Sequence, residues 1–326
     1  MSSLHMTPRG IPLSPGLSYI DLNFLRQPKA IATAFVHASG SVALIDPGPS
    51  TSVDSLELGL RAQGLSLDDV GVILLTHIHL DHAGATGILV RRNPDIEVFV
   101  HERGATHLSD PGKLVESAAR YFGPANMERF WGEIIPVPED RLHLLRGGER
   151  VEVGRRSFEV LYTPGHASHH VTYFDRGSGI AFVGDAAGMR IDGGYVLPPT
   201  PPPDINVQQW IESIRQISAL QAHTLFVTHF GPAQGVETHL QTLATNLRWM
   251  SGLVRDSFNE DATDEERSRR FGARIRREML QRTEPALMPA YEPTAPLETL
   301  WFGLARDLRK NQVEVKSGTA DPGAQM

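Results

Sequence analysis

The 326-residue chain contains no cysteine. This absence excludes disulfide bonds, thiolate metal ligands and cysteine nucleophiles. It also fits a reducing compartment, so a cytoplasmic location is our expectation for this protein.

Long apolar stretches and basic runs are also missing. No segment reaches the roughly 18 consecutive apolar residues of a membrane-spanning helix, and residues 1–10 lack the apolar core of a signal peptide. The net charge of −7 argues against nucleic acid as a partner. We therefore expect a small-molecule substrate, no membrane insertion and no nucleic-acid binding, and the sequence leaves a homodimer open.

Histidine and aspartate, by contrast, are concentrated in one short segment. Thr76-His77-Ile78-His79-Leu80-Asp81-His82 holds three imidazoles and one carboxylate, and it follows the apolar run 70–75, which predicts a buried strand. Imidazole and carboxylate together suit zinc, iron or manganese. The segment therefore predicts a metal site at the end of a strand.

Three later residues could complete such a site. They are His166 in a Thr-Pro-Gly-His turn, Asp185 in a Gly-Asp turn, and His229 in a Thr-His-Phe-Gly segment. Each alone also fits an ordinary turn, and for His229 alone a structural role is favoured. Burying the dense cluster without a shared metal, however, would leave several polar groups unpaired.

The spacing of the cluster predicts two ions. Side chains two residues apart in an extended segment point the same way, so His77 and His79 can bind one ion together with His166. Asp81 and His82 fall on the next turn and can bind a second ion.

Two further residues complete the predicted set. His229 is the natural third ligand of the second ion, and the two oxygens of Asp185 could bridge both ions. An open position is left for water, as in catalytic rather than structural sites.

We expect the cofactors to be two divalent ions, zinc before iron or manganese. Two ions about 3.5–4 Å apart can hold a bridging hydroxide and polarise a carbonyl oxygen. Asp81 is assigned a second, catalytic role, in which its free oxygen orients the water and accepts its proton. Asp46 ends another apolar strand and is predicted to hold a ligand histidine in the correct tautomer.

The segment Thr76–His82, followed in order by His166, Asp185 and His229, resembles the metallo-β-lactamase-fold superfamily. The likeness extends over about Leu17 to Pro232. It implies the same assignment of ligands, with Asp185 as the bridge. Because this fold hosts many chemistries, the resemblance specifies a substrate much less than a site.

Within the superfamily the chain looks closer to the glyoxalase II group. Residues 163–170, Thr-Pro-Gly-His-Ala-Ser-His-His, are similar to the TPGHTxGH pattern of that group, with His170 at the second histidine. The stretch 165–186 also resembles the quinolone-signal thioesterase PqsE. Acyl-lactone hydrolases usually carry a tyrosine three residues after the bridging aspartate, where this chain has Gly188, which weakens a lactonase assignment.

The expected function is hydrolysis of a thioester or ester by attack of metal-bound hydroxide. Three alternatives stay open. They are an iron-dependent oxidoreductase similar to persulfide dioxygenases, a lactonase, and a non-enzymatic ligand-binding or signalling member of the fold.

Apolar periodicity predicts strands, then helices, then strands, then helices. This order indicates an α/β (α+β) protein built as an αββα sandwich with a helical C-terminal subdomain. We expect a catalytic domain over 1–235, the helical subdomain over 236–310, and a disordered tail over 311–326. The helices expected in the C-terminal region are Val236–Phe258, Thr263–Arg282 and Pro296–Lys310.

Several segments are candidates for the substrate pocket. The stretch Gly193–Pro203, with five prolines in six positions, is predicted to be stiff and to form a pocket wall with Met189 and Tyr195, although a plain connector is the alternative. His170 is a further pocket candidate. A second wall, or simply packing between helices, is expected from Tyr121, Phe122, Phe130 and Trp131. The C-terminal helices are expected to form either a lid or a stabilising cover or dimer surface.

Overall fold

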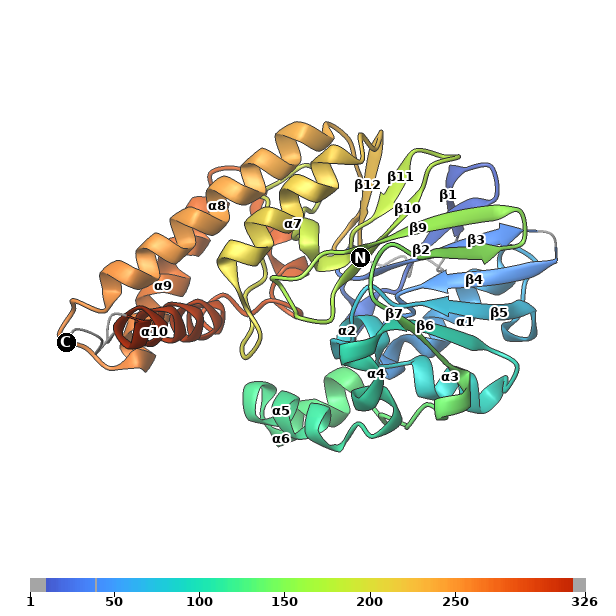
Figure 1. The fold of residues 1–326 in the computed structure, drawn as a ribbon, viewed down its shortest axis with the longest axis horizontal. Helices are drawn as coiled ribbons and strands as arrows, with labels where there is room; N and C mark the ends of the chain where they lie inside the picture. Colours follow the sequence, from blue (N-terminus) through green and yellow to red (C-terminus); the bar gives the residue numbers. More distant parts are fainter. Residues whose placement is uncertain (1–9, 39, 319–326) are drawn as a thin grey trace, which may run out of the picture.

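The computed structural model describes residues 10–38 and 40–318. Two β-sheets pack against each other, and helices cover the outer face of each sheet. Figure 1 shows α7–α10 on the left of the sheets and α3–α6 below them. The αββα sandwich predicted from the sequence is confirmed.

The first sheet has its strands in sequence order. Its strands are β1 (Gly10–Ser14), β2 (Leu17–Asp21), β3 (Ala32–Ala38), β4 (Ser41–Ile45), β5 (Val70–Leu74), β6 (Glu97–His101) and β7 (Leu142–Leu145). The first four strands pair antiparallel, whereas β4 to β7 pair parallel. The C-terminal ends of β4 and β5 therefore lie at the same edge of the sheet.

The second sheet has the strand order β13-β12-β11-β10-β9-β8. Its strands are β8 (Arg150–Val153), β9 (Arg156–Tyr162), β10 (Val171–Asp175), β11 (Ile180–Phe182), β12 (Thr224–Val227) and β13 (Gly231–Ala233). All neighbouring pairs are antiparallel except β11 and β12.

The helices fall into two groups, one on each sheet. On the first sheet lie α1 (Val53–Arg61), α2 (Leu80–Ala83), α3 (Thr86–Arg92), α4 (Glu102–Ser109), α5 (Gly112–Phe122) and α6 (Pro124–Asn126). On the side of the second sheet are α7 (Val207–Ala219), α8 (Val236–Ser257), α9 (Asp264–Met279) and α10 (Leu300–Gly318), and α9 and α10 pack against α8. Among the described residues, no helix combines the length and apolarity needed to cross a membrane.

Alternating apolar side chains explain the layers. In β4, Val42 and Leu44 belong to the apolar cluster under the helices, whereas Ala43 and Ile45 belong to the cluster between the sheets. Because successive side chains of a strand point to opposite faces, a strand apolar at every position is buried on both sides.

Two strands at the edges of the sheets were not predicted from the sequence. β1 and β13 contain the short sequences Gly-Ile-Pro-Leu-Ser and Gly-Pro-Ala. Proline cannot donate to a ladder and is tolerated at sheet edges, so neither segment carries a strand signal of its own.

The C-terminal region differs from expectation at its boundaries. The last helix begins at Leu300 rather than Pro296 and continues to Gly318, past Lys310. Part of the tail expected to be disordered, 311–318, is therefore helical, and 319–326 lie outside the described residues. The sequence after Lys310 has no helix breaker before Gly318, which explains the longer helix.

One apolar cluster joins the C-terminal helices to the sandwich. It contains Ala181 and Leu225 of the second sheet together with Leu243, Ile275 and Leu304 of α8, α9 and α10. The helices after residue 235 are thus the outer layer of the second sheet and share its core.

Candidate metal centre and adjoining cavity

The predicted cluster follows β5 at the edge of the first sheet. The chain leaves β5 through Thr76, whose carbonyl accepts a hydrogen bond from the N–H of Val171 in β10 (2.8 Å). This bond joins the two sheets beside the site. One turn of helix, α2, then carries Asp81 and His82, with His79 as its N-terminal cap.

Three imidazoles form the first ligand group. Nδ1 of His79 lies 3.0 Å from Nε2 of His77 and 3.0 Å from Nε2 of His166. His77 and His166 are buried. Three ring nitrogens that converge at this distance fit a shared cation better than mutual hydrogen bonds, because one proton cannot serve both contacts.

A second group consists of Asp81, His82 and His229. Nε2 of His229 lies 3.3 Å from Oδ2 of Asp81, and Nε2 of His82 lies 3.8 Å from the same oxygen. The structure therefore brings together both triplets predicted from the sequence.

Asp185 lies between the two groups. Its Oδ2 is 3.5 Å from Nε2 of His166, whereas its Oδ1 is 3.4 Å from Nε2 of His82 and 3.5 Å from Nε2 of His229. One oxygen thus faces each group, as a bridging ligand requires.

Hydrogen bonds on the far side of the rings orient these histidines. Nδ1 of His166 faces the carbonyl of Pro199 (2.9 Å), and Nδ1 of His229 faces the carbonyl of Ala30 (2.7 Å). A carbonyl only accepts, so each Nδ1 carries the proton and each Nε2 keeps its lone pair for the site.

Asp46 orients His82 in the same way. Its Oδ2 lies 2.9 Å from Nδ1 of His82 and accepts from the hydroxyls of Thr76 (2.7 Å) and Thr228 (3.1 Å). Its Oδ1 accepts from the Thr76 N–H (2.8 Å). The structure places Asp46 behind His82, a candidate ligand, and this contact is the one that the sequence predicted.

The chemistry of the donors fits divalent metal ions. His82 Nε2, His229 Nε2 and Asp185 Oδ1 are buried and have no hydrogen-bond partner among the described residues. Three groups of potential ligand atoms lie within 4.8 Å of one another, namely His77, His79 and His166; His77, His82 and Asp185; and Asp81, His82 and His229. Buried polar atoms without partners are costly, and a bound cation removes that cost.

The pKa values of the histidines reflect burial and the nearby charges. Burial lowers the pKa of His77 well below its usual value and that of His79 to about 4. Burial also acts on His82, but the carboxylates of Asp81 and Asp185 outweigh it and raise the pKa of His82. Neutral imidazoles, the form that binds metals, therefore predominate in the first group.

His170 is a supporting residue rather than a pocket residue. It is fully buried, its Nδ1 lies 3.0 Å from Oγ1 of Thr163, and its Nε2 accepts from the N–H of Ala186 (3.3 Å). It thereby holds the turn that carries Asp185. Gly184 makes this approach possible: its φ is +44°, and a Cβ there would lie 2.8 Å from Nε2 of His170.

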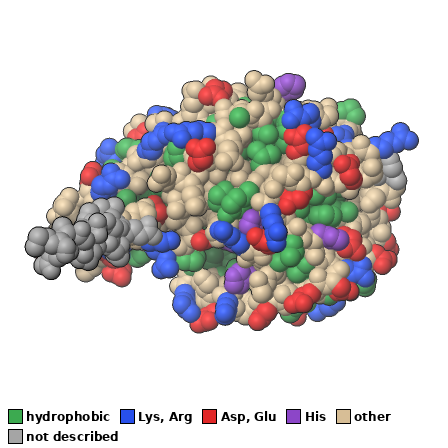
Figure 2. Space-filling model, in the orientation of Figure 1, with side chains coloured by type: hydrophobic (Ala, Val, Ile, Leu, Met, Phe, Trp, Pro, Cys, Tyr) green, Lys and Arg blue, Asp and Glu red, His purple; other side chains and the backbone are tan. Residues whose placement is uncertain are grey.

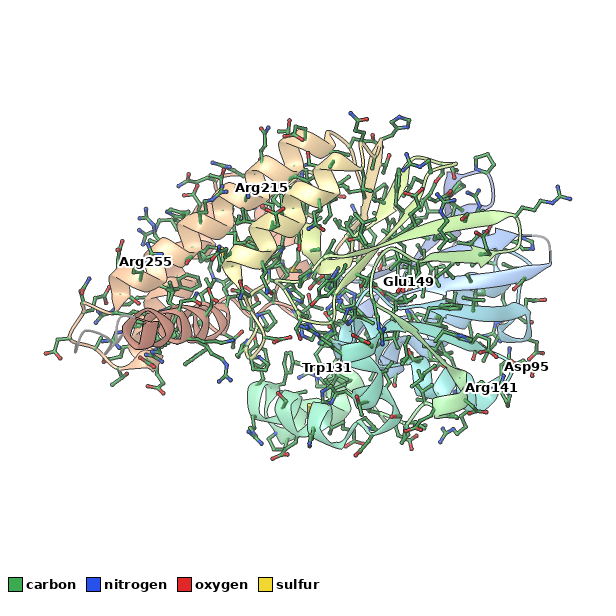
Figure 3. The ribbon with its side chains drawn as sticks, viewed as in Figure 1. Asp95, Trp131, Arg141, Glu149, Arg215 and Arg255 are labelled. Carbon is green, nitrogen blue, oxygen red and sulfur yellow. The ribbon has the colours of Figure 1, made fainter. Side chains whose placement is uncertain are left out.

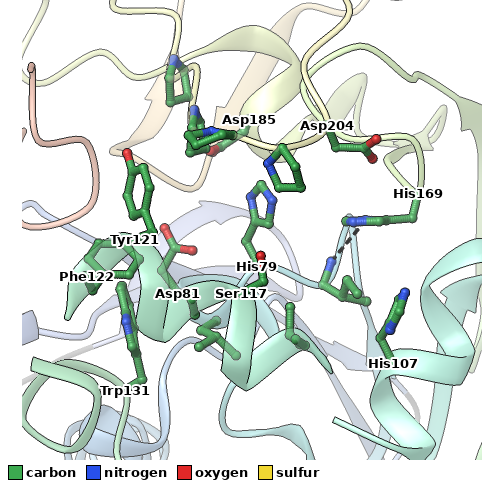
Figure 4. Close-up of a pocket in the computed structure, with 18 of the residues that line it drawn as sticks. His79, Asp81, His107, Ser117, Tyr121, Phe122, Trp131, His169, Asp185 and Asp204 are labelled. Atoms are coloured by element: carbon green, nitrogen blue, oxygen red, sulfur yellow. Dashed lines mark hydrogen bonds between the residues drawn. The ribbon is translucent and has the colours of Figure 1, made fainter. Parts of the chain in front are cut away.

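A cavity of about 360 Å³ opens directly in front of the ligands. His79, Asp81 and Asp185 line it together with Ser117, Tyr121 and Phe122 of α5 (Figure 4). Its lining includes Leu114, Ser117, Ala118, Tyr121, Phe122, Trp131, Pro199, Pro201, Pro202 and Pro203. The proline-rich loop and the 121–131 segment are both walls of this cavity.

Two predicted pocket residues are in fact core residues. Met189 and Tyr195 are 0% and 1% exposed and belong to the apolar cluster under α7–α10. Met189 pairs with Leu197 in a β-bridge, and the N–H of Tyr195 donates to Thr283. The chain after Asp185 therefore turns away from the cavity before its prolines return to it.

The C-terminal helices do not cover the cavity as a lid. From the described part of that region, only Thr294 lines it, and Tyr121 hydrogen-bonds Thr299 at its edge. Phe130 packs in the apolar cluster of the first sheet.

Five other lining residues could not be predicted from sequence patterns. They are Arg103, His107, Lys113, Ser117 and His169. All except His169 lie on α4 or α5, and only the tertiary packing of these helices brings them to the site. His169 directly precedes His170 in the sequence, but the sequence does not indicate that the His169 side chain points into the cavity.

Comparison with known proteins agrees with this geometry. The sequence model described as the metallo-beta-lactamase superfamily matches residues 27–229. A metallo-β-lactamase fold-containing protein of Sulfurisphaera tokodaii is 29% identical over 65% of this chain and 78% of its own. A hydroxyacylglutathione hydrolase of Fuscovulum blasticum is 35% identical over 58% of this chain and 56% of its own.

A solved structure supports the fold. The metallo-β-lactamase family protein of Thermus thermophilus superposes with a TM-score of 0.66 at 23% identity, over 95% of this chain and 93% of the other.

Proposed function

Because the chain belongs to the metallo-β-lactamase superfamily, we propose that it is a dinuclear metal-dependent hydrolase that cleaves a thioester or an ester. The observation that carries this proposal is the position of Asp185 between two triplets of buried ligand atoms, beside an open cavity. Zinc is the ion we propose, and the same donors also accept iron or manganese.

Each proposed ion has its own ligands. His77, His79 and His166 would hold one, and Asp81, His82 and His229 the other, with Asp185 shared. Divalent ions bound there would act as Lewis acids that lower the pKa of water and polarise a carbonyl oxygen.

Asp81 is suited to move the proton. Its Oδ2 faces His229, whereas its Oδ1 makes no hydrogen bond within the described residues, and the side chain lines the cavity. Oδ1 can therefore accept a proton from a water molecule that attacks a bound carbonyl.

The cavity walls favour an acyl substrate. Aromatic and proline side chains surround the space in front of Asp81 and exclude water from an apolar acyl group. The similarity to a hydroxyacylglutathione hydrolase also supports cleavage of an acyl derivative.

The structure weakens the lactonase alternative further. Gly188 has a φ of +72°, and a Cβ there would lie 2.7 Å from Leu243 and 2.8 Å from the carbonyl of Leu197. A tyrosine cannot occupy this position without moving α8 or the following loop.

The test combines metal analysis with a substrate panel. We expect about two zinc or manganese ions per chain and cleavage of small acyl thioesters or esters, and Asp81→Asn should lower kcat about 10²- to 10⁴-fold. Because Asp81 is also a ligand, the metal content of the variant must be measured alongside. One iron with oxygen uptake would replace the hydrolase by the dioxygenase alternative, and full metal loading without cleavage of any panel member would favour a binding protein.

A further inference from the structure

We propose that the substrate is an acyl thioester whose leaving thiol carries phosphate groups, with its acyl chain against the aromatic side of the cavity. This inference rests on the proposed hydrolase function and names the class of substrate for that same site. Two observations lead to it. One end of the cavity is aromatic and the other is basic, and a second cavity continues from the basic end.

The acyl end is aromatic. Tyr121, Phe122 and Trp131 lie together on one side of Asp81 in Figure 4. Trp131 is 1% exposed, and its ring lies 4.9 Å from that of Phe122. Such a packed wall accepts an alkyl or aryl group and offers no charge to a polar one.

The opposite end is polar and basic. Figure 4 shows His107, His169 and Asp204 on the far side of His79 from Tyr121. Along α5 itself, Lys113, Ser117 and Tyr121 follow at intervals of four residues and so share one helix face. Since a helix rises about 1.5 Å per residue, this face passes from a cation to an aromatic ring over about 12 Å.

A second cavity of about 400 Å³ continues from the basic end. The two cavities share Arg103, Ser168, Pro203 and Asp204, and the second adds Arg306 and Lys310 of α10. Figure 2 shows Lys, Arg and His side chains around the hollow where the C-terminal helices meet the sandwich. A long leaving group can therefore extend from the metal site across this surface.

The cations along this groove stand apart from the ion pairs of the described residues. Within the described part of the chain, no ion pair involves Arg103, Lys113, Arg306 or Lys310. By contrast, most arginines of the outer sheet surface are paired, as Arg176 is with Glu159. A protein of net charge −7 thus gathers four cations around one groove, and none of them is ion-paired to another described residue.

The two acidic residues of the groove are engaged elsewhere. Asp204 accepts from the N–H of Ser168 (2.6 Å), and the buried Asp307 accepts from the N–H of Val207 (3.5 Å) at the start of α7. Both carboxylates reduce the positive potential of the groove, and Asp204 forms no ion pair with a cation of the described residues.

Several separated cations favour a polyanion over a single carboxylate. Guanidinium and ammonium groups bind phosphate oxygens through charge-assisted hydrogen bonds. A carrier with phosphates spaced along its length can reach Lys113 and Arg103 near the metals and Arg306 and Lys310 beyond them. With the thiol carrier bound along these cations, the acyl group of the thioester lies against the aromatic wall.

The test compares three thioesters of one acyl group on the metal-loaded, full-length protein. The substrates are octanoyl coenzyme A, with phosphates; S-octanoylglutathione, with carboxylates; and S-octanoyl-N-acetylcysteamine, with no charge. We expect kcat/KM to be at least about 10- to 100-fold higher for the coenzyme A thioester than for the neutral one. Higher ionic strength should reduce this advantage.

Charge-reversal variants locate the effect. Arg306→Glu combined with Lys310→Glu should lower kcat/KM for octanoyl coenzyme A about 10- to 100-fold and leave the neutral thioester within about twofold. The matched control reverses two exposed, unpaired arginines of α8, Arg248→Glu with Arg255→Glu; Arg255 is labelled in Figure 3, away from the cavity. This control should leave all three rates unchanged.

Binding of desulfo-coenzyme A, which has no thiol, gives a readout independent of catalysis. Calorimetry should show binding to the wild type and to the control, and loss of it in the Arg306→Glu, Lys310→Glu protein. Equal rates for all three thioesters, or preference for the glutathione thioester, would overturn the phosphate-carrier inference while the hydrolase stands. Binding of desulfo-coenzyme A without cleavage of any thioester or ester would support the carrier site and overturn the proposed function.

Discussion

Replacing Asp46 by asparagine tests how the site controls its ligands. Oδ2 of Asp46 faces three groups, Nδ1 of His82 and the hydroxyls of Thr76 and Thr228. An amide nitrogen at this position donates where the carboxylate accepted. The hydroxyls can rotate and accept instead, but the N–H of His82 cannot.

The imidazole of His82 must then change tautomer. With Nδ1 as an acceptor, the proton moves to Nε2, the atom that lies 3.4 Å from Asp185 and belongs to the second ligand group. A protonated nitrogen cannot bind a metal, so the variant must break either this coordination or the hydrogen bond. Loss of such an outer partner costs about 10- to 100-fold in metal affinity, which is about 1.4–2.7 kcal/mol.

The expected outcome is a loss of metal affinity. Chelator competition should show at least one of two ions weakened by this factor, because Asp46 contacts Nδ1 of His82 directly (2.9 Å) and reaches Nδ1 of His77 through Oγ1 of Thr76 (2.7 and 3.1 Å). Nitrogen NMR of the histidines should show the proton of His82 on Nε2 in the metal-free variant. Thr228→Val removes one bond to Asp46 without changing His82 and serves as the control. Two ions of unchanged affinity, with Nδ1 of His82 still protonated, would refute the reasoning.

Three further predictions concern stability. Removing the metal with a chelator should lower the free energy of unfolding by about 4 kcal/mol per ion, compared with protein in free metal at about a thousand times Kd. Added zinc should restore this stability, and thermal unfolding measures both changes. Gly184→Ala should destabilise by about 2–4 kcal/mol, since its Cβ would lie 2.4 Å from Oγ1 of Thr76 at positive φ; Gly252→Ala, in open space on α8, should stabilise by about 0.4–1 kcal/mol in the same denaturant titration. Burial lowers the pKa of His239 to about 4, so its contribution is complete above pH 6.5 and falls as the pH drops toward 4. His239→Gln should therefore flatten the loss of stability over this pH range by about 1–3 kcal/mol, and equal slopes for both proteins would contradict this assignment.

The clustering of the candidate ligands could be predicted because their geometry is local or follows from strand order. His77 to His82 span the end of one strand and one helical turn, so their spacing alone decides which side chains meet. The contact of Asp46 with His82 also follows from a simple rule. Asp46 ends β4, the cluster ends β5, and parallel neighbours finish at the same edge.

The cavity walls could not be predicted in this way. Met189 and Tyr195 are close to Asp185 in sequence, but the β-bridge from Met189 to Leu197 turns both into the core. Tyr121 is far from every ligand in sequence and nevertheless lines the cavity. Proximity along the chain does not determine which way a side chain points. The position of α5 depends on tertiary packing that no short sequence motif encodes.

Helices α7 and α8 support the turn that carries Asp185. Trp210 Nε1 of α7 donates to the carbonyl of Ala186 (2.8 Å), and Nε2 of His239 in α8 lies 2.8 Å from the carbonyl of Ala187. Both bonds hold the turn that begins with Asp185. Each proposed ion takes ligands from both sheets, so its affinity depends on how this turn is held against the His77–His82 segment. The region that sequence patterns separated as a subdomain therefore helps to support Asp185, the proposed bridging ligand.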